Sequence, residues 1–221
     1  TYLFILLAFF VNIPNLAASE PYPLEAPDTS SPRATMKTFQ TIIRNAKPIV
    51  AKVRTSGFSM EITRELRDLQ VDATRCLDLS QVPKKLRDDV GIESGVLLAE
   101  ILGRIALPPY RAIPDANMLE LKKVSRWTIP HTEITIARVK EGPRQGEYLF
   151  TPETISNLSK FFNKIRDLPY RPGSVIEKLG PAGGFYEYHS SSPRGVVPIR
   201  LIEILPSWAR SIYFDHPVWQ W

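Results

Sequence analysis

Three glutamates near the middle of the chain, Glu133, Glu147 and Glu153, are the first residues whose types and spacing could do chemistry. Two carboxyl groups held roughly 5 to 10 Å apart in a cleft can hydrolyse a glycosidic bond. The sequence sets no such distance. Glu133 alternates with the apolar Ile134, which predicts that it faces solvent. Glu153 falls at a predicted helix start, where a carboxylate stabilises the positive helix end. The pattern therefore disfavours paired-carboxylate catalysis.

The histidines and the single cysteine form no recognised metal or nucleophile motif. His131, His189 and His216 are not at metal-ligand spacing, and HExxH and cysteine clusters are absent from the sequence. A Ser-His-Asp triad stays open, although the chain has no GxSxG motif. Cys76 lies among apolar neighbours and is expected to be a buried structural thiol. We predict no metal site, no cofactor and no catalytic residue, and hence a protein that is not an enzyme.

The elements that must position these glutamates lie in residues 126–155, RWTIPHTEITIARVKEGPRQGEYLFTPETI. Ile134 and Ile136 fall on one face of an alternating pattern, which predicts a half-buried strand. Glycine and proline turn residues follow, and the apolar residues 148–150 predict a second strand. We therefore expect a β-hairpin whose loop is longer than the tight two-residue type.

A typical helix start follows the hairpin. Thr151 is a preferred N-cap, Pro152 suits the first helical position, and Glu153 lies in the first turn. The apolar stripe of this helix consists of Ile155, Leu158, Phe161, Phe162 and Ile165. A final helix, broken by Pro206, is expected within residues 196–214.

Helical periodicity dominates the first half of the chain. Ser31 and Pro32 predict a helix start, and Pro48 is expected to kink this helix or end its first part. Its apolar positions are Met36, Phe39, Ile43, Ala46 and Val50. A second helix is predicted over residues 61–76. Its buried stripe is Ile62, Leu66, Leu69 and Ala73.

A third helix is expected to open at Pro83, after a turn capped by Ser80, and Gly91 is expected to interrupt it. One side of it is lined by Leu86, Val90, Leu97, Ile101 and Ile105. Residues 107–117, LPPYRAIPDAN, should stop helix formation. The first half is therefore predicted to be a unit of three or four helices.

Composition agrees with a folded domain. The chain has 221 residues, of which 43% are hydrophobic, with 20 prolines and a net charge of +5. The charge is spread along the chain without a basic block, so nucleic-acid binding is disfavoured. We predict an α+β fold, with a mainly helical N-terminal half followed by a β-hairpin packed with further helices. The helical unit spans residues 32–110 and the hairpin-plus-helix unit residues 111–214, and together they are expected to form one domain.

The N-terminal residues resemble a secretion signal. Residues 2–13, YLFILLAFFVNI, form an apolar run that is too short for a standard span of about 20 residues but suits a signal peptide. Small residues follow, so we predict a signal peptide over residues 1–19 and a proline-rich linker over residues 20–31. A truncated span or a buried helix is the alternative.

Tryptophans gather near the C-terminal end. Trp208, Trp219 and Trp221 are candidates for a membrane interface, because indole rings favour the boundary between lipid and water. Residues 215–221 would then lead into a membrane span that lies outside this sequence. A helix packed on the domain is an equally good interpretation of the residues.

The segment RWTIPHTEITIARVKEGPRQGEYLFTPETI, with LPYRPG after it and PVWQW at the end, resembles the extracytoplasmic N-terminal region of a group of bacterial mechanosensitive ion channel family proteins. These are long relatives of the small-conductance mechanosensitive channel. CLDLSQVPKKLRDDVG and LLAEILGRIALPP, upstream, fit the same region. The resemblance covers roughly residues 32–221.

The resemblance implies a domain at the bacterial inner membrane, on its periplasmic side. In such proteins this region precedes transmembrane helices, a pore-lining helix and a cytoplasmic β-rich domain. The channels are homo-oligomeric and open under membrane tension. The expected function is therefore that of an extracytoplasmic accessory domain that modulates assembly or gating, with the bilayer as partner through an adjoining channel region. None of the pore-forming motifs is in this sequence, so no pore residue is assigned.

Two other functions stay open. A periplasmic envelope-ligand binding or sensor domain is one, with Phe185, Tyr186 and Tyr188 stacking on a sugar ring from the loop at residues 178–195. The alternative interpretation of that loop is a solvated segment with aromatic anchors. Its GPAGG stretch matches neither a phosphate-binding loop nor GxGxxG. An envelope hydrolase is the third function, which the residue pattern disfavours.

Overall fold

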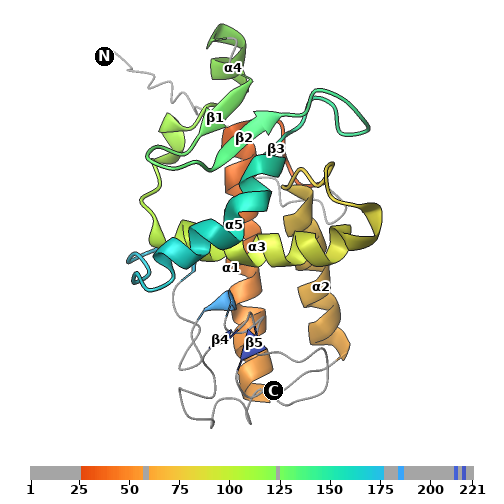
Figure 1. Cartoon of the computed structure of the whole chain (residues 1–221), viewed down its shortest axis with the longest axis vertical. Helices are drawn as coiled ribbons and strands as arrows, with labels where there is room; N and C mark the ends of the chain where they lie inside the picture. The colour runs from red at the N-terminus through yellow and green to blue at the C-terminus, as the bar shows by residue number, and fades with distance from the viewer. Residues whose placement is uncertain are drawn as a thin grey trace, which may run out of the picture.

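The computed structural model describes residues 26–56, 60–122, 125–176, 184–186, 212–213 and 216–217. Helices come first along the chain, and a three-stranded antiparallel sheet lies in its middle (Figure 1). The predicted α+β fold with a mainly helical first half is confirmed.

The first helix, α1 (Pro32–Ser56), begins where its residues predict. The Ser31 hydroxyl oxygen accepts a hydrogen bond from the backbone N–H of Ala34 at 3.2 Å, as an N-cap does. The helix runs through Pro48 to Ser56 and does not end there. Apolar residues on both sides of Pro48 pack into the core, which holds the helix together across the missing hydrogen bond. All five positions of the predicted stripe are buried: Met36, Phe39, Ile43, Ala46 and Val50.

Helix α2 (Met60–Arg75) packs on α1 and on α3 (Arg87–Arg104). Gly91 lies inside α3 and does not interrupt it. A Cβ atom at Gly91 would lie 2.8 Å from the Cγ2 atom of Thr74 in α2, so glycine permits the close contact between these helices. The prediction that Gly91 interrupts the helix is therefore wrong. Glycine is needed here for close packing of α2 and α3, and not for its backbone flexibility.

Leu86 was expected in the buried stripe of the third helix but is 50% exposed. It ends a 3₁₀ turn, η1 (Lys84–Leu86), which precedes α3 and has a different period. In the turn before Pro83, where Ser80 was expected as the cap, the side-chain acceptor is Asp78: its carboxylate accepts from the Ser80 backbone N–H at 3.0 Å. From Ser94 to Gly103, α3 is buried on nearly all sides, which explains its weak amphipathic pattern.

Residues 107–117 interrupt the helices, as predicted, but helical turns resume within them. A 3₁₀ turn, η2 (Tyr110–Ala112), is followed by α4 (Ala116–Lys122). The Asp115 carboxylate accepts from the Met118 N–H at 2.9 Å and pairs with Arg33 of α1 at 2.7 Å. Asp115 therefore both caps α4 and fixes it to the first helix.

The sheet has the order β1 (Arg126–Thr128), β2 (Thr135–Arg138) and β3 (Tyr148–Phe150). The predicted hairpin of β2 and β3 is confirmed, with Ile136 opposite Phe150. Strand β1 was not predicted. On its other edge β3 binds the chain after α2: Phe150 donates to the Cys76 carbonyl at 3.0 Å and accepts from the Asp78 N–H at 2.9 Å.

Helix α5 (Pro152–Ile165) starts as predicted, because the Thr151 hydroxyl oxygen accepts from the Thr154 N–H. Ile155, Leu158 and Phe162 are buried, and Phe161 and Ile165 are partly buried against the core. The helix lies across α3 and packs against it (Figure 1). Buried side chains of both predicted units, from Met36 to Phe185, form a single hydrophobic cluster.

The described part of the predicted linker, residues 26–31, is attached to the domain. The Tyr148 N–H of β3 donates to the Thr29 carbonyl at 2.8 Å. Within the expected final helix only residues 212–213 are described, and they form β4 (Ile212–Tyr213), paired with β5 (His216–Pro217). The rest of that helix and the predicted signal peptide lie outside the described residues.

Candidate functional site

Glu147 stabilises the hairpin turn. Its carboxylate accepts hydrogen bonds from Arg144 at 2.6 and 3.1 Å and from the Thr29 hydroxyl at 2.7 Å. The Arg144 guanidinium also donates to the carbonyls of Arg75 and Leu77 at the end of α2. Hydrogen bonding from Arg144, with a smaller contribution from Thr29, lowers the pKa of Glu147. The group is thus a structural anion that ties the hairpin to α2, and it is poorly suited to act as a general acid.

The other two glutamates have separate roles. Glu153 is exposed at the start of α5, where hydrogen bonds from its own backbone N–H and from Thr151 lower its pKa. Glu133 is exposed in the turn before β2, as predicted. Glu153 therefore stabilises a helix end and Glu133 faces solvent, so neither is placed to act with Glu147 in catalysis.

The histidine closest to these glutamates in sequence occupies a tight turn. His131 is exposed and has a φ of 62°, the left-handed conformation, in the turn that follows Pro130. The side chains of His189 and His216 lie outside the described part of the chain. Among the residues that the structure describes, no group of three His, Cys, Asp or Glu side chains could hold a metal ion.

Cys76 is fully buried at the end of α2, beside the bridge to β3. Burial raises the pKa of its thiol to about 12, and the charge of Arg144 offsets only part of that rise. The thiol is therefore protonated at neutral pH and unreactive, because the thiolate is the nucleophile. The interpretation of Cys76 as a structural thiol is confirmed.

We expect the native chain to resist alkylation by iodoacetamide at Cys76 between about pH 7 and pH 9, where an ordinary thiol with a pKa near 8.5 ionises. Because the pKa is raised, increasing the pH over this range adds almost no thiolate. Mass spectrometry of the native chain and of the urea-unfolded chain checks this. Rapid labelling of the native chain with a pH midpoint near 8.5 would contradict it.

The two described aromatic residues of the predicted sugar-binding loop anchor it to the domain. Phe185 is only 6% exposed, so its ring has no free face for a sugar. Tyr186 is half-buried, and its ring centroid lies 4.6 Å from that of Phe162 on α5. Tyr188 lies outside the described residues, as do Trp208, Trp219 and Trp221. The described part of the loop thus fits the interpretation of aromatic anchors.

A buried carboxylate holds these anchors. Glu100 of α3 is 1% exposed and accepts from the Tyr170 hydroxyl at 2.5 Å and from the Tyr186 N–H at 3.0 Å. Arg104, one helical turn later, pairs with Glu100 and lies 4.0 Å from the centroid of the Tyr170 ring. Burial and the Glu100 carboxylate raise the pKa of Tyr170. Sequence reasoning missed this cluster, although a glutamate inside LLAEILGR with an arginine four residues later is a signal for it.

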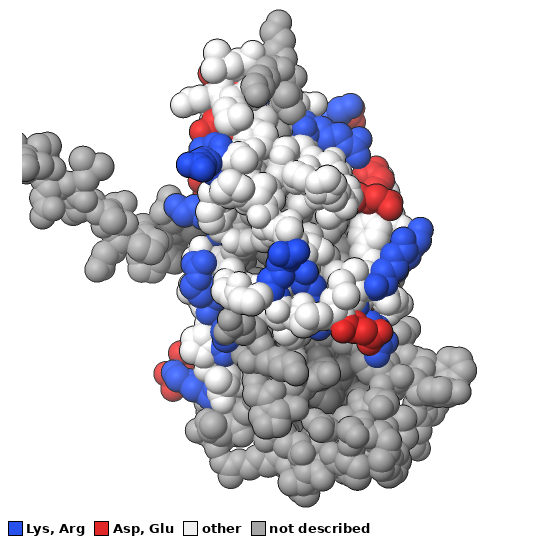
Figure 2. Space-filling model, turned by 90° about the vertical axis from the view of Figure 1, so that its left-hand side faces the viewer, with Lys and Arg blue, Asp and Glu red and all other residues white. Residues whose placement is uncertain are grey.

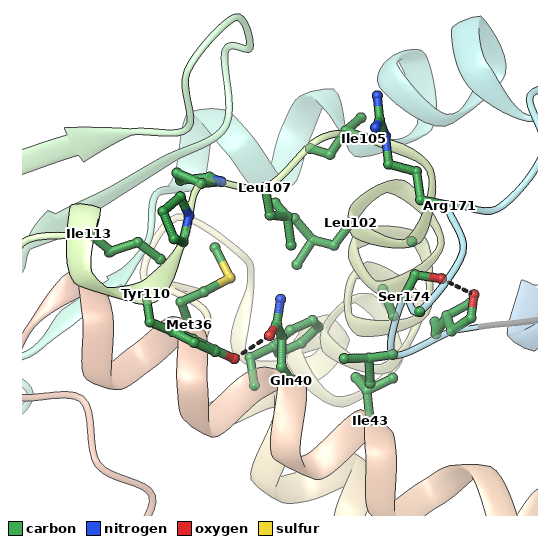
Figure 3. A pocket seen from close by; sticks show the side chains of 18 of the residues that line it. Met36, Gln40, Ile43, Leu102, Ile105, Leu107, Tyr110, Ile113, Arg171 and Ser174 are labelled. Atoms are coloured by element: carbon green, nitrogen blue, oxygen red, sulfur yellow. Dashed lines mark hydrogen bonds between the residues drawn. The ribbon is translucent and has the colours of Figure 1, made fainter.

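A separate feature of the structure is an apolar pocket of about 370 Å³ (Figure 3). It lies between α1, the C-terminal part of α3, the proline-rich loop at residues 105–113 and the turn at residues 171–176. Its apolar walls include Met36, Phe39, Ile43, Leu102, Leu107 and Ile113. Figure 3 shows Met36 and Gln40 rising from α1 toward Leu102 and Leu107 on the opposite side. The volume lies in the range of small-molecule sites.

The polar groups in the pocket wall are largely paired with one another. The Tyr110 hydroxyl donates to the Gln40 side-chain oxygen, and the Ser174 hydroxyl donates to the Ile176 carbonyl at 2.9 Å (Figure 3). Burial raises the pKa of Tyr110, and the positive charge of Arg44 partly offsets the rise. Among the described residues of the lining, Arg171 is the charged one, and none is Asp or Glu.

The face around the pocket is poor in charge. Figure 2 shows the left-hand side of the view in Figure 1, where the proline-rich loop and the turn after α5 lie. A broad area without charged side chains occupies its upper part, a group of Lys or Arg side chains lies directly below it near the middle of the view, and other charged side chains lie at the margins. The pocket can therefore bind an apolar group, and the residues of its lining that the structure describes offer no acid–base pair for catalysis.

Sequence reasoning did not predict this pocket. Residues 107–117 were interpreted only as a stop to helix formation. The apolar residues Leu107, Tyr110 and Ile113, three apart within a proline-rich loop, were the available signal.

Comparisons with known proteins identify no relative of this chain. No family model matches the chain, and neither the curated proteins nor the solved structures give a significant match. Within the described residues, no helix combines the length and the apolar character needed to cross a membrane.

Proposed function

We propose that this chain is the extracytoplasmic accessory domain of a membrane-tension-gated ion channel, on the periplasmic side of the bacterial inner membrane. The resemblance of residues 126–155 to such proteins motivates the proposal. The observation that supports it best is the role of those residues in the fold. They build the whole three-stranded sheet and the start of α5, and Ile136, Phe150 and Thr151 are buried within them.

The residues that resemble the channel proteins lie in the core and at a helix cap. Such residues determine a fold, so the resemblance indicates a shared fold more directly than a shared reaction. This suits a domain that acts by packing. The glutamates of the same segment stabilise a turn and a helix end or face solvent, and the described residues contain no metal cluster. A non-catalytic role is therefore the one that the site chemistry favours.

Tension favours the channel state with the larger in-plane area, and a domain shifts that equilibrium only through contacts that differ between the closed and open states. A rigid domain beside the pore can do so by packing between neighbouring subunits of a homo-oligomer or against lipid. The single core that joins the helices, the sheet and α5 gives this domain the rigidity to transmit such contacts.

The test uses the full-length protein encoded by the gene, expressed in giant bacterial spheroplasts that lack their own tension-gated channels. The encoding DNA beyond Trp221 should specify several apolar spans of about 20 residues. Replacing the buried Ile136 with asparagine should unfold the sheet and shift the tension threshold in patch recordings, whereas Lys140→Asn, on the exposed turn nearby, should leave the threshold unchanged.

A stop codon directly after Trp221 would remove the channel proposal. It would also fail if Ile136→Asn and deletion of residues 32–176 both left assembly, threshold and ion passage unchanged.

A second candidate function, periplasmic envelope-ligand binding or sensing, is favoured by one specific observation, the apolar pocket. The two functions are compatible. A ligand bound in the pocket would contact both α1 and α3 and restrict their relative motion. If these helices move between the closed and open channel states, the ligand would shift the gating equilibrium.

A further inference from the structure

We propose that the apolar pocket binds an anionic amphiphile, a molecule with one flexible hydrocarbon chain and a carboxylate or phosphate headgroup held by Arg171. The inference names the ligand of the second candidate function. It holds whether or not the chain belongs to a channel.

The size and lining of the pocket suit a single hydrocarbon chain. A water-sized group occupies about 30 Å³ in a liquid, so a volume of about 370 Å³ holds roughly a dozen methylene-sized groups. Side chains from α1, α3 and the proline-rich loop present apolar surface on several sides. Burying a hydrocarbon chain there removes its apolar surface and that of the walls from water, which is the main driving force for such binding.

The uncharged polar side chains of the lining already have hydrogen-bond partners within the protein, so the pocket interior suits apolar ligand atoms. Gln40 and Tyr110 are hydrogen-bonded to each other, and the Ser174 hydroxyl is bonded to a backbone carbonyl. A strongly polar ligand such as a sugar would have to compete with these bonds and would leave many of its hydroxyls facing apolar side chains. The pocket therefore selects against carbohydrates and for a hydrocarbon chain.

The charge at the pocket selects the headgroup. Arg171 is exposed and contributes to the pocket lining, and Figure 3 shows its side chain extending from the turn past Ile105. The structure gives this side chain no ion pair with a described residue. A guanidinium binds carboxylate and phosphate through paired hydrogen bonds. With Arg44 near Tyr110 and no acidic residue among the described residues of the lining, the charge that these residues offer is complementary to an anion.

The experiment is a calorimetric titration of the purified 221-residue chain with sodium dodecanoate, below its micelle concentration, and with dodecanol as the uncharged match. Dodecanoate should bind at least tenfold more tightly than dodecanol. Arg171→Glu should weaken dodecanoate binding roughly tenfold, which corresponds to the loss of one charge-assisted contact. Leu107→Trp, which fills the pocket from a loop, should weaken both ligands by at least the same factor.

The matched control is Arg166→Glu, which makes the same charge change at an exposed position outside the pocket lining and should bind as the parent does. Circular dichroism verifies that each variant is folded. Leu107→Trp also separates pocket binding from adsorption to the apolar residues 2–13, because adsorption would not respond to that change.

Vesicles separate the two sources of such a ligand. Vesicles of phosphatidylglycerol, compared with phosphatidylcholine, test a membrane lipid, while dodecanoate tests a free fatty acid. Binding of either one that weakens in both Arg171→Glu and Leu107→Trp supports the proposal and identifies the source. Three results would overturn it. The first is binding that is the same in these two variants as in Arg166→Glu. The others are equal affinity for dodecanoate and dodecanol, and no binding of either the vesicles or dodecanoate.

Discussion

Replacing Glu100 with alanine is expected to lower the free energy of unfolding by about 3–5 kcal/mol, the usual loss when one partner of a buried ion pair is removed. The side chain of Arg104 is only 9% exposed, so its charge would stay largely buried without its partner. The Tyr170 hydroxyl and the Tyr186 N–H would lose their acceptor in the same step. The effect should therefore exceed that of an ordinary helix substitution.

The reason lies in what Glu100 holds together. It links α3 to two segments that are far from it in the chain, Tyr170 after α5 and residues 184–186. A side chain at Gly184 would collide with the Tyr170 hydroxyl and with Glu100, so glycine is required where this segment crosses the carboxylate. Without Glu100, the segment should detach before the rest of the domain unfolds.

Urea unfolding and amide hydrogen exchange measure these two effects. A loss of this size should lower Tm by roughly 10 °C in a domain of this length. Glu100→Gln keeps an acceptor and should cost less than Glu100→Ala, while Glu93→Ala, on the exposed side of the same helix, should change stability little. If Glu100→Ala lost no more stability than Glu93→Ala and kept the Tyr186 amide protected, the cluster would have no stabilising role.

The parts of the fold that were predictable are those determined by neighbours in sequence. Thr151 and Pro152 define the start of α5 by themselves, because a cap needs only the next few residues. The stripe of α1 is likewise a property of local spacing and is buried as expected. Pro48 does not end the helix, because the packing of its neighbours outweighs one lost hydrogen bond.

The parts that were missed depend on partners far away in sequence. Strand β1 has only three residues, too few to show an alternating pattern, and it is defined by its pairing with β2. Gly91 resembles a helix breaker until Thr74 of α2 is placed against it. The apolar pocket joins residues of α1, the proline-rich loop and the turn after α5, so no single segment carries its pattern. Phe185, in a loop rich in glycine and serine, is buried in the common hydrophobic cluster, and the next residue's N–H donates to Glu100 of α3.

Replacing Phe150 with alanine is the second change with a large expected effect, a loss of about 3–5 kcal/mol in the free energy of unfolding. Phe150 is fully buried in β3, and its ring meets that of Phe39 on α1 edge-on, with centroids 5.7 Å apart. Its backbone also bonds the chain after α2. Phe161→Ala removes a ring that is only partly buried on α5 and should cost clearly less.

A double-mutant cycle with Phe39→Leu and Phe150→Leu isolates the contact between the two rings, which should be worth about 0.5–1.5 kcal/mol beyond the buried area. Leucine keeps most of the apolar volume, so neither single change should unfold the domain. Because this contact joins the first helix to the sheet, a coupling in that range together with a single unfolding transition would mean that the predicted helical and hairpin units unfold together. A coupling near zero, with separate unfolding transitions for helices and sheet, would instead make them two domains in one chain.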